Sequence, residues 1–130
     1  MAWQGIVEQY FKEMERIDVS FPRDKVRQVV DLLFQAWKDR RTVFAMGNGG
    51  SASTASHFAS DLAKFTIVPG KPRFKVVSLN DNAPLVGAWT NDSGFGSIFA
   101  EQMEPWLQEG DVVVGFSVHG GSGTGDAGPW

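Results

Sequence analysis

The first forty residues carry apolar side chains at helical spacing. Steps of three and four residues separate the apolar positions of the first segment, so they form one stripe on a helix: Trp3, Ile6, Val7, Tyr10, Phe11, Met14 and Ile17. Ser20 and Pro22 interrupt this pattern, and a second helix is expected after them. Its apolar side carries Val26, Val29, Val30, Leu33 and Trp37, and its other side carries Arg23, Lys25, Arg27 and Gln28. We predict a helical hairpin over residues 1–40, with an apolar surface that packs either on its own chain or on another subunit.

From residue 41 onward, short apolar runs alternate with helical patterns. Strands are expected at residues 42–46, 74–79 and 112–116, and helices at 51–65, 83–90 and 95–107. The first and third runs are apolar almost throughout, which is typical of parallel strands buried on both faces. The alternation predicts an α/β fold, a three-layer αβα sandwich with helices on both faces of a parallel sheet.

The end of the chain departs from this alternation. A loop rich in glycine and hydroxyl groups follows the third strand from Ser117 to Gly125, and no helical pattern comes after it. Three parallel strands without a further crossover would leave an apolar face and a strand edge exposed. We therefore expect a single but incomplete domain, in which the hairpin (1–40) precedes an α/β core (41–122) and a Gly-rich tail (123–130).

Composition narrows the classes of partner. The 130 residues suit one domain, and a net charge of −3 with scattered Lys and Arg argues against a nucleic-acid partner. No apolar run is long enough to cross a bilayer, so no membrane association is expected. The chain has no cysteine, which fits a reducing cytoplasm. A small molecule is the expected partner.

The most informative motif is the glycine turn between the first strand and the next helix, Gly47-Asn48-Gly49-Gly50-Ser51. A helix start presents unpaired N–H groups and the positive end of its dipole, and glycines let a ligand approach the backbone, so this motif favours an anion such as phosphate. With Ala52 the motif also fits the dinucleotide-binding pattern G-x-G-x-x-A, but no acidic residue closes a second strand about 20 residues on. The alternative is that these glycines only form a tight turn and bind no ligand.

His57 and Asp61 are four residues apart, so they lie on one face of the helix that follows the glycine turn. They could share a metal ion or act as an acid/base pair, although an isolated pair of this kind is more often structural. The other histidine, His119, lies in the second glycine loop, so polar chemistry converges where parallel strands end. Asn91-Asp92 is a third candidate, in a polar break that also suits a turn or helix cap.

The combined motifs closely resemble one family. Gly47 to Ser51, the run His57-Phe58-Ala59-Ser60-Asp61-Leu62, Asn91-Asp92, and the segment from Gly110 to Ser117 with Ser122 are similar to the sugar isomerase (SIS) domain of phosphoheptose isomerases. The resemblance implies a flavodoxin-like strand order. It also implies that Asn48, Gly49, Gly50 and Ser51 hold a phosphorylated sugar, that Ser117 and Ser122 grip its phosphate, and that Asn91 and Asp92 contact its hydroxyls. His119 replaces a hydroxyl residue of the family's second loop and is included among the predicted substrate contacts.

The resemblance also implies a chemistry. His57 matches a zinc ligand of the family, and Asp61 stands where the family has a glutamate that is both a ligand and the catalytic base. The expected activity is aldose–ketose isomerisation of sedoheptulose 7-phosphate or a similar sugar phosphate through an enediol, in a homodimer or homotetramer assembled through the N-terminal helices. The alternative is a non-catalytic SIS module that binds sugar phosphates or a protein partner, because the family's C-terminal Gln and His ligands have no counterpart in this sequence.

Overall fold

The computed structural model describes residues 2–118 and 120, and the chain divides into two compact units, residues 1–32 and 33–130. The first unit contains helix α1 (Ala2–Ser20) and the beginning of helix α2 (Arg23–Lys38). Both predicted N-terminal helices are therefore present. Their association as a hairpin stays a prediction.

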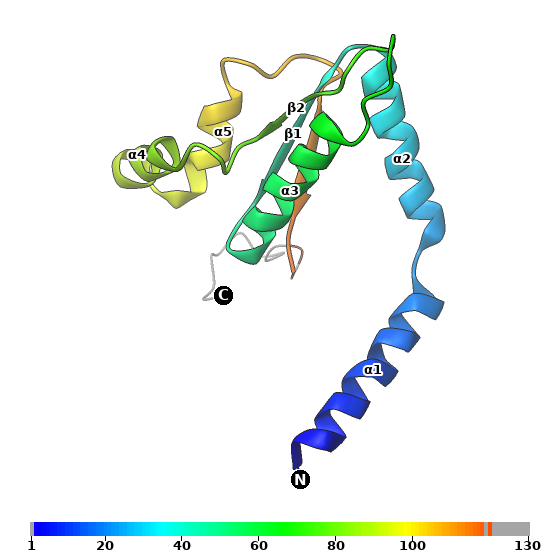
Figure 1. The fold of residues 1–130 in the computed structure, drawn as a ribbon. Helices are drawn as coiled ribbons and strands as arrows, with labels where there is room; N and C mark the ends of the chain where they lie inside the picture. The colour runs from blue at the N-terminus through cyan, green and yellow to red at the C-terminus, as the bar shows by residue number, and fades with distance from the viewer. Residues whose placement is uncertain (1, 119, 121–130) are drawn as a thin grey trace. The chain divides into compact units, whose positions relative to one another are not determined.

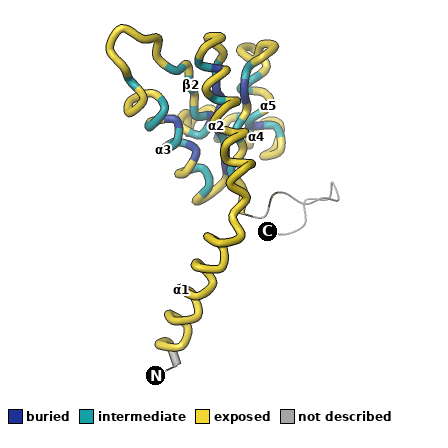
Figure 2. The backbone as a smooth tube through the Cα atoms, turned by 90° about the vertical axis from the view of Figure 1, so that its right-hand side faces the viewer, coloured by how far each residue is buried: buried dark blue, intermediate teal, exposed yellow. Residues whose placement is uncertain are grey.

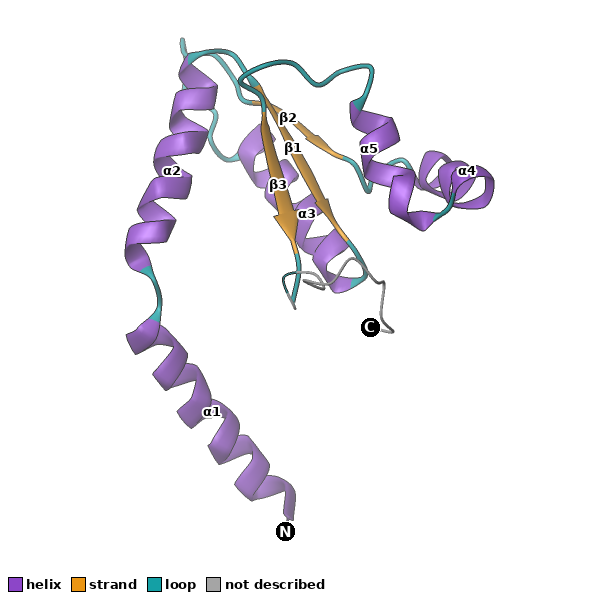
Figure 3. Cartoon of the chain, turned by 180° about the vertical axis from the view of Figure 1, so that it is seen from behind, coloured by secondary structure: helices purple, strands orange, loops and turns teal. Residues whose placement is uncertain are grey.

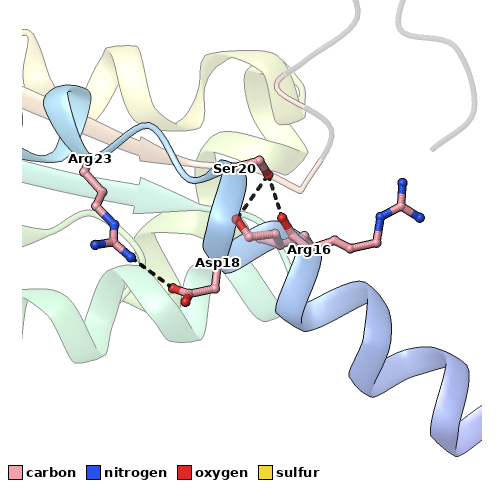
Figure 4. A network of polar contacts seen from close by, with 5 residues as sticks. Arg16, Asp18, Ser20 and Arg23 are labelled. Carbon is pink, nitrogen blue, oxygen red and sulfur yellow. Dashed lines mark hydrogen bonds and ion pairs between the residues drawn. The ribbon is translucent and has the colours of Figure 1, made fainter.

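Local polar contacts lie at the junction between α1 and α2 (Figure 4). The hydroxyl of Ser20 donates to the carbonyl oxygens of Arg16, at 2.9 Å, and Ile17, at 3.2 Å, which satisfies acceptors in the last turn of α1. Across this junction Arg23 lies 3.8 Å from the carboxylate of Asp18. Both side chains of this ion pair are exposed, so it contributes little to stability.

The apolar stripe of α1 is exposed in the described structure (Figure 2). Its members include Trp3, Ile6, Tyr10, Phe11 and Ile17. An exposed apolar patch on one helix face is typical of a surface that meets another protein surface. No helix among the described residues is long and apolar enough to cross a membrane.

The second unit is built on a parallel sheet of three strands (Figure 1). The strands are β1 (Thr42–Gly47), β2 (Lys75–Ser78) and β3 (Val112–Phe116), in the order β2-β1-β3. Each neighbour pairs with β1 in parallel, with Thr42 opposite Lys75 and Val43 opposite Val112. The prediction of an α/β fold with a parallel sheet in flavodoxin-like order is confirmed, and the three strands form an open sheet.

Helix α3 (Gly50–Lys64) covers one face of this sheet. Small residues on the helix, Ala55 and Ala59, are buried against Ala45 of β1, so helix and strand approach closely. Phe58 closes this layer at the β3 side, where its ring packs edge to face with Phe116 at 5.4 Å. The end of α2 adds Ala36, which is buried in a cluster with strand residues on the same unit.

The opposite face of the sheet is covered less completely. Helix α4 (Ala83–Ser93), the short 3₁₀ helix η1 (Phe95–Ser97) and helix α5 (Ile98–Met103) lie beside β2 (Figures 1 and 3). Between these helices and the strands lies a hollow of about 750 Å³, lined by Phe44 and Val77 of the sheet and by Leu85 and Trp106. Helices therefore flank both faces, as the three-layer prediction requires.

Two predicted helix boundaries were wrong. The helix expected over residues 95–107 is found as η1 followed by α5, which ends at Met103 because Pro105 has no backbone N–H to extend the helical hydrogen bonds. The helix expected to end at residue 90 continues to Ser93 and stops at Gly94, whose φ of 86° is a conformation that favours glycine.

Candidate functional site

The glycine turn lies at the carboxyl end of the central strand, where β1 passes into α3. Gly49 adopts φ 55° and ψ −123°, a conformation that only glycine adopts readily. No side chain caps the first turn of α3. The N–H groups of Ser51, Ala52 and Ser53 donate to the backbone carbonyl oxygens of Asn48 and Gly49, and among the described residues the N–H of Gly50 meets no acceptor, so it is left for a ligand. Asn48, Gly49 and Gly50 are exposed and Ser51 is half-buried, so the turn is open to solvent. This geometry suits the anion site predicted from the sequence.

Gly47 has a different role from its neighbours. It is buried, and a Cβ atom at this position would collide with the backbone carbonyl group of Ser51 and lie 2.9 Å from the backbone nitrogen of Ala52. The first turn of α3 therefore packs directly on the backbone of residue 47. The absence of a side chain at Gly47 sets how closely the helix start approaches the end of β1.

His57 and Asp61 lie on one exposed face of α3, as their spacing predicts. The Nε2 atom of His57 is 3.5 Å from Oδ2 of Asp61, and the two side chains are 80% and 46% exposed. Phe58 of α3 and Phe116 at the end of β3 line the same open hollow as this pair. The two polar side chains thus meet in a hollow bordered by the end of β3.

The donor set of this pair fits part of a zinc site. Two ligands of a tetrahedral Zn²⁺ ion, each about 2.0–2.1 Å from the metal, lie about 3.3 Å apart, which is close to the observed separation. Within residues 2–118 and 120, no third His or acidic side chain joins His57 and Asp61 in a group that could hold a metal ion. These two residues therefore supply two ligands, and a complete site requires more.

The second predicted loop begins at the same edge of the sheet. Because Gly47 pairs with Phe116, Ser117 follows β3 beside the glycine turn that follows β1. The hydroxyl of Ser117 accepts a hydrogen bond from the backbone N–H of Gly120 at 3.0 Å. The other predicted contacts in this loop, His119 and Ser122, lie outside the described residues.

Asn91 and Asp92 occupy a helix end and not the loop that the sequence indicated. Both are exposed in the last turn of α4, and the amide of Asn91 donates to the carboxylate of Asp92 at 2.8 Å. Among the described residues, no hydrogen bond connects this pair with the glycine turn. Their role as sugar contacts stays a prediction.

A polar cluster that the sequence interpretation missed follows β2. Ser78 and Asn80 are half-buried there, and Asp81 accepts hydrogen bonds from the hydroxyls of Ser78, at 2.9 Å, and Ser56, at 2.5 Å. Ser56 belongs to α3 and precedes His57 in the chain. The sequence did contain a signal for this cluster, because its polar residues come directly after a predicted parallel strand. Such residues lie at the edge where parallel sheets bind ligands.

Comparisons with known proteins agree with this fold. The model of the SIS domain family matches residues 9–124. The lincomycin biosynthesis protein LmbN of Streptomyces lincolnensis is 48% identical over 94% of the chain and 44% of its own length. Phosphoheptose isomerases of Geotalea uraniireducens and Aquifex aeolicus are 38% and 32% identical, over 75% and 89% of the chain and 51% and 62% of their own lengths.

Solved structures give the same picture. Phosphoheptose isomerase GmhA of Neisseria gonorrhoeae superposes with a TM-score of 0.77 at 29% identity, over 88% of the chain and 60% of the isomerase. A phosphoheptose isomerase of Francisella tularensis superposes with a TM-score of 0.79 at 22% identity, over 90% and 62% of the two chains, which supports the fold. The chain thus spans between about two fifths and two thirds of the lengths of these proteins.

Proposed function

The chain belongs to the SIS domain family, and we propose that it binds a sugar phosphate and takes part in interconverting its aldose and ketose forms. Relatives named phosphoheptose isomerase support this reading, with identities of 38% and 32%. The more similar LmbN is named for lincomycin biosynthesis, so the proposed substrate is sedoheptulose 7-phosphate or another ketose phosphate of similar build.

The observation that carries the proposal is the uncapped start of α3 on the same helix as His57 and Asp61. The helix start offers the N–H of Gly50 and a positive dipole end to the phosphate group. About two turns further along, the imidazole and carboxylate lie on one exposed face. One helix thus supplies an anion site and an acid/base pair, the two functions that isomerisation of a sugar phosphate requires.

In the proposed reaction Asp61 removes a proton from the hydroxyl-bearing carbon next to the carbonyl group and returns it to the former carbonyl carbon. Through the enediol, a second proton passes from the hydroxyl oxygen to the former carbonyl oxygen, so that the carbonyl and hydroxyl groups exchange places. The carboxylate is close enough to His57 for an ion pair when the imidazole is protonated, and this contact orients both side chains. His57 and Asp61 would also hold zinc, which as a Lewis acid stabilises negative charge on the sugar oxygens. Asn48, Gly49, Gly50, Ser51, Ser117, His119 and Ser122 are the proposed contacts of the substrate, with Asn91 and Asp92 at its hydroxyls.

We propose that the protein works as a homodimer or homotetramer in the cytoplasm. The exposed apolar stripe of α1 provides a surface for a second copy. The absence of cysteine suits a reducing compartment.

The proposal is tested by mixing the chain with zinc and ketose phosphates of different lengths, and by following aldose formation and binding separately. We expect the unmodified chain to form an aldose phosphate. The Asp61→Asn variant should form none but should still bind the ligand. A chain that binds no sugar phosphate under these conditions would contradict the proposal.

A second function, a non-catalytic module that binds sugar phosphates, has one observation in its favour. Among the described residues, no third His or acidic side chain joins His57 and Asp61 as a possible metal ligand, and two ligands are fewer than a catalytic zinc site uses. Binding without turnover, in the presence of zinc and with an intact Asp61, would select this function.

A further inference from the structure

Asn80 makes two hydrogen bonds to a single residue of the glycine turn. Its Oδ1 atom accepts from the backbone N–H of Gly47 at 3.0 Å, and its Nδ2 group donates to the carbonyl oxygen of Gly47 at 2.8 Å. The first turn of α3 packs against the backbone of the same glycine. Both backbone groups of Gly47 are therefore held by one side chain that lies 33 positions later in the chain.

The position of Asn80 follows from the register of the sheet. The strand pairing runs from Thr42 opposite Lys75 to Ala45 opposite Ser78, and Leu79 adds a last backbone hydrogen bond to the carbonyl oxygen of Ala45 at 2.9 Å. Continued in the same register, residue 80 would stand opposite Gly47. Backbone pairing has ended there, and the side-chain amide of Asn80 takes the place of a peptide group of β2.

The turn that presents this amide is itself held by hydrogen bonds. The backbone N–H of Asn80 donates to the hydroxyl of Ser78 at 3.3 Å, and that hydroxyl donates to Asp81. Asp81 also accepts from Ser56 of α3. The turn that carries Asn80 is therefore held by β2 and α3, while the side chain of Asn80 holds the end of β1.

An amide suits this position and a carboxylate does not. One acceptor and one donor on the same planar group match the carbonyl and N–H groups of Gly47, whereas a carboxylate offers acceptors alone. An aspartate would keep the bond from the N–H group but would turn an oxygen toward the carbonyl oxygen of Gly47. The change therefore removes one hydrogen bond and replaces it with a repulsive contact.

We infer that Asn80 is a positioning residue of the sugar-phosphate site, which it serves by holding Gly47 so that the glycine turn and the start of α3 keep the geometry that binds the phosphate group. This role rests on the proposed function. Asn80 does not touch the ligand in this scheme. It acts through Gly47 on the N–H groups of the residues that follow.

The test compares Asn80→Asp with Asn82→Asp in the full chain. Asn82 caps α4 by accepting a hydrogen bond from the N–H of Leu85 at 3.1 Å, and an aspartate can accept the same bond. Both variants make the same change of charge and shape two residues apart, but only Asn80→Asp loses a donor to the glycine turn. Asn82→Asp therefore controls for added negative charge near the site.

Nuclear magnetic resonance titrations with inorganic phosphate and with sedoheptulose 7-phosphate, read at the amides of Gly49, Gly50 and Ser51, give the dissociation constants. A net hydrogen-bond contribution of about 0.5–1.5 kcal/mol corresponds to roughly a 2- to 12-fold change, so we expect about threefold to tenfold weaker binding for Asn80→Asp. Asn82→Asp should bind within about twofold of the unmodified chain. In the unmodified chain the side-chain amide protons of Asn80 should exchange slowly, and the Gly47 signal should shift in Asn80→Asp alone.

Each outcome bears on a different claim. Unchanged binding by a folded Asn80→Asp variant would overturn the positioning role, even if its thermal unfolding temperature fell. If that variant does not fold, Asn80→Ala replaces it with the same expected weakening and the same criterion. If the unmodified chain binds neither ligand, the proposed function is overturned, and with it the role of Asn80. If all variants bind equally well, only the role of Asn80 is overturned.

Discussion

Replacing Gly47 with alanine should strongly destabilise the protein. The added Cβ atom would collide with the backbone carbonyl group of Ser51 and lie 2.9 Å from the backbone nitrogen of Ala52. These atoms belong to the first turn of α3, so no flexible side chain can move aside, and the helix start must shift away from β1. Overpacking of a tight site costs about 1–3 kcal/mol, and we expect a loss near the upper end of this range, at about 3 kcal/mol.

Gly50→Ala is the matched control for this prediction. A Cβ atom at Gly50 meets nothing within 4 Å, and the residue begins α3, where alanine is a better helix former than glycine. Urea unfolding followed by circular dichroism gives the free energy of unfolding of each variant. We expect Gly50→Ala to be neutral or slightly stabilising. Stabilities of the two variants that agree within about 0.5 kcal/mol would refute the argument that Gly47 is required by the approach of the helix.

Three further substitutions test other parts of the structure. Asp111→Ala should lower the free energy of unfolding by about 2 kcal/mol. The carboxylate accepts a hydrogen bond from the N–H of Thr42 at 2.7 Å, and the substitution leaves this N–H unpaired. Urea unfolding measures the loss, and an unchanged midpoint would contradict the prediction. Ile6→Glu should shift the chain from oligomer to monomer in sedimentation experiments, because it places a charge in the exposed apolar stripe of α1, and an unchanged mass would exclude that surface. His57→Ala should abolish zinc binding in calorimetric titrations, and Asp61→Asn should weaken it, whereas equal affinities would remove the pair as ligands.

Features set by local sequence could be predicted. The strand expected at residues 42–46 is found as Thr42–Gly47, and the helix expected at residues 51–65 is found as Gly50–Lys64, because apolar periodicity and a glycine turn act over a few residues. The contact between His57 and Asp61 followed from helical spacing in the same way.

Features set by distant pairing could not be predicted. The role of Asn80 depends on a register that places it opposite Gly47, and nothing near residue 80 in the sequence reveals that register. Trp37 lies among the apolar positions of the second helical pattern, yet its indole N–H donates to the carbonyl oxygen of Pro72 at 2.8 Å, which is also a contact between residues far apart in the sequence. The boundary of α5 was a different case, since Pro105 was a local signal that the apolar periodicity outweighed.

The two halves of the proposed site are built differently, and this difference has a consequence for function. The phosphate half consists of backbone groups whose positions are set from outside, by the bare backbone at Gly47 and by the amide of Asn80. The acid/base half consists of two exposed side chains, His57 and Asp61, on a single helix face. Substitutions of Gly47 and Asn80 should therefore change both stability and ligand affinity, because these residues fix backbone atoms that serve binding geometry and packing together. Substitutions in the second half should leave stability nearly unchanged and alter only metal binding and turnover, since exposed side chains contribute little to packing.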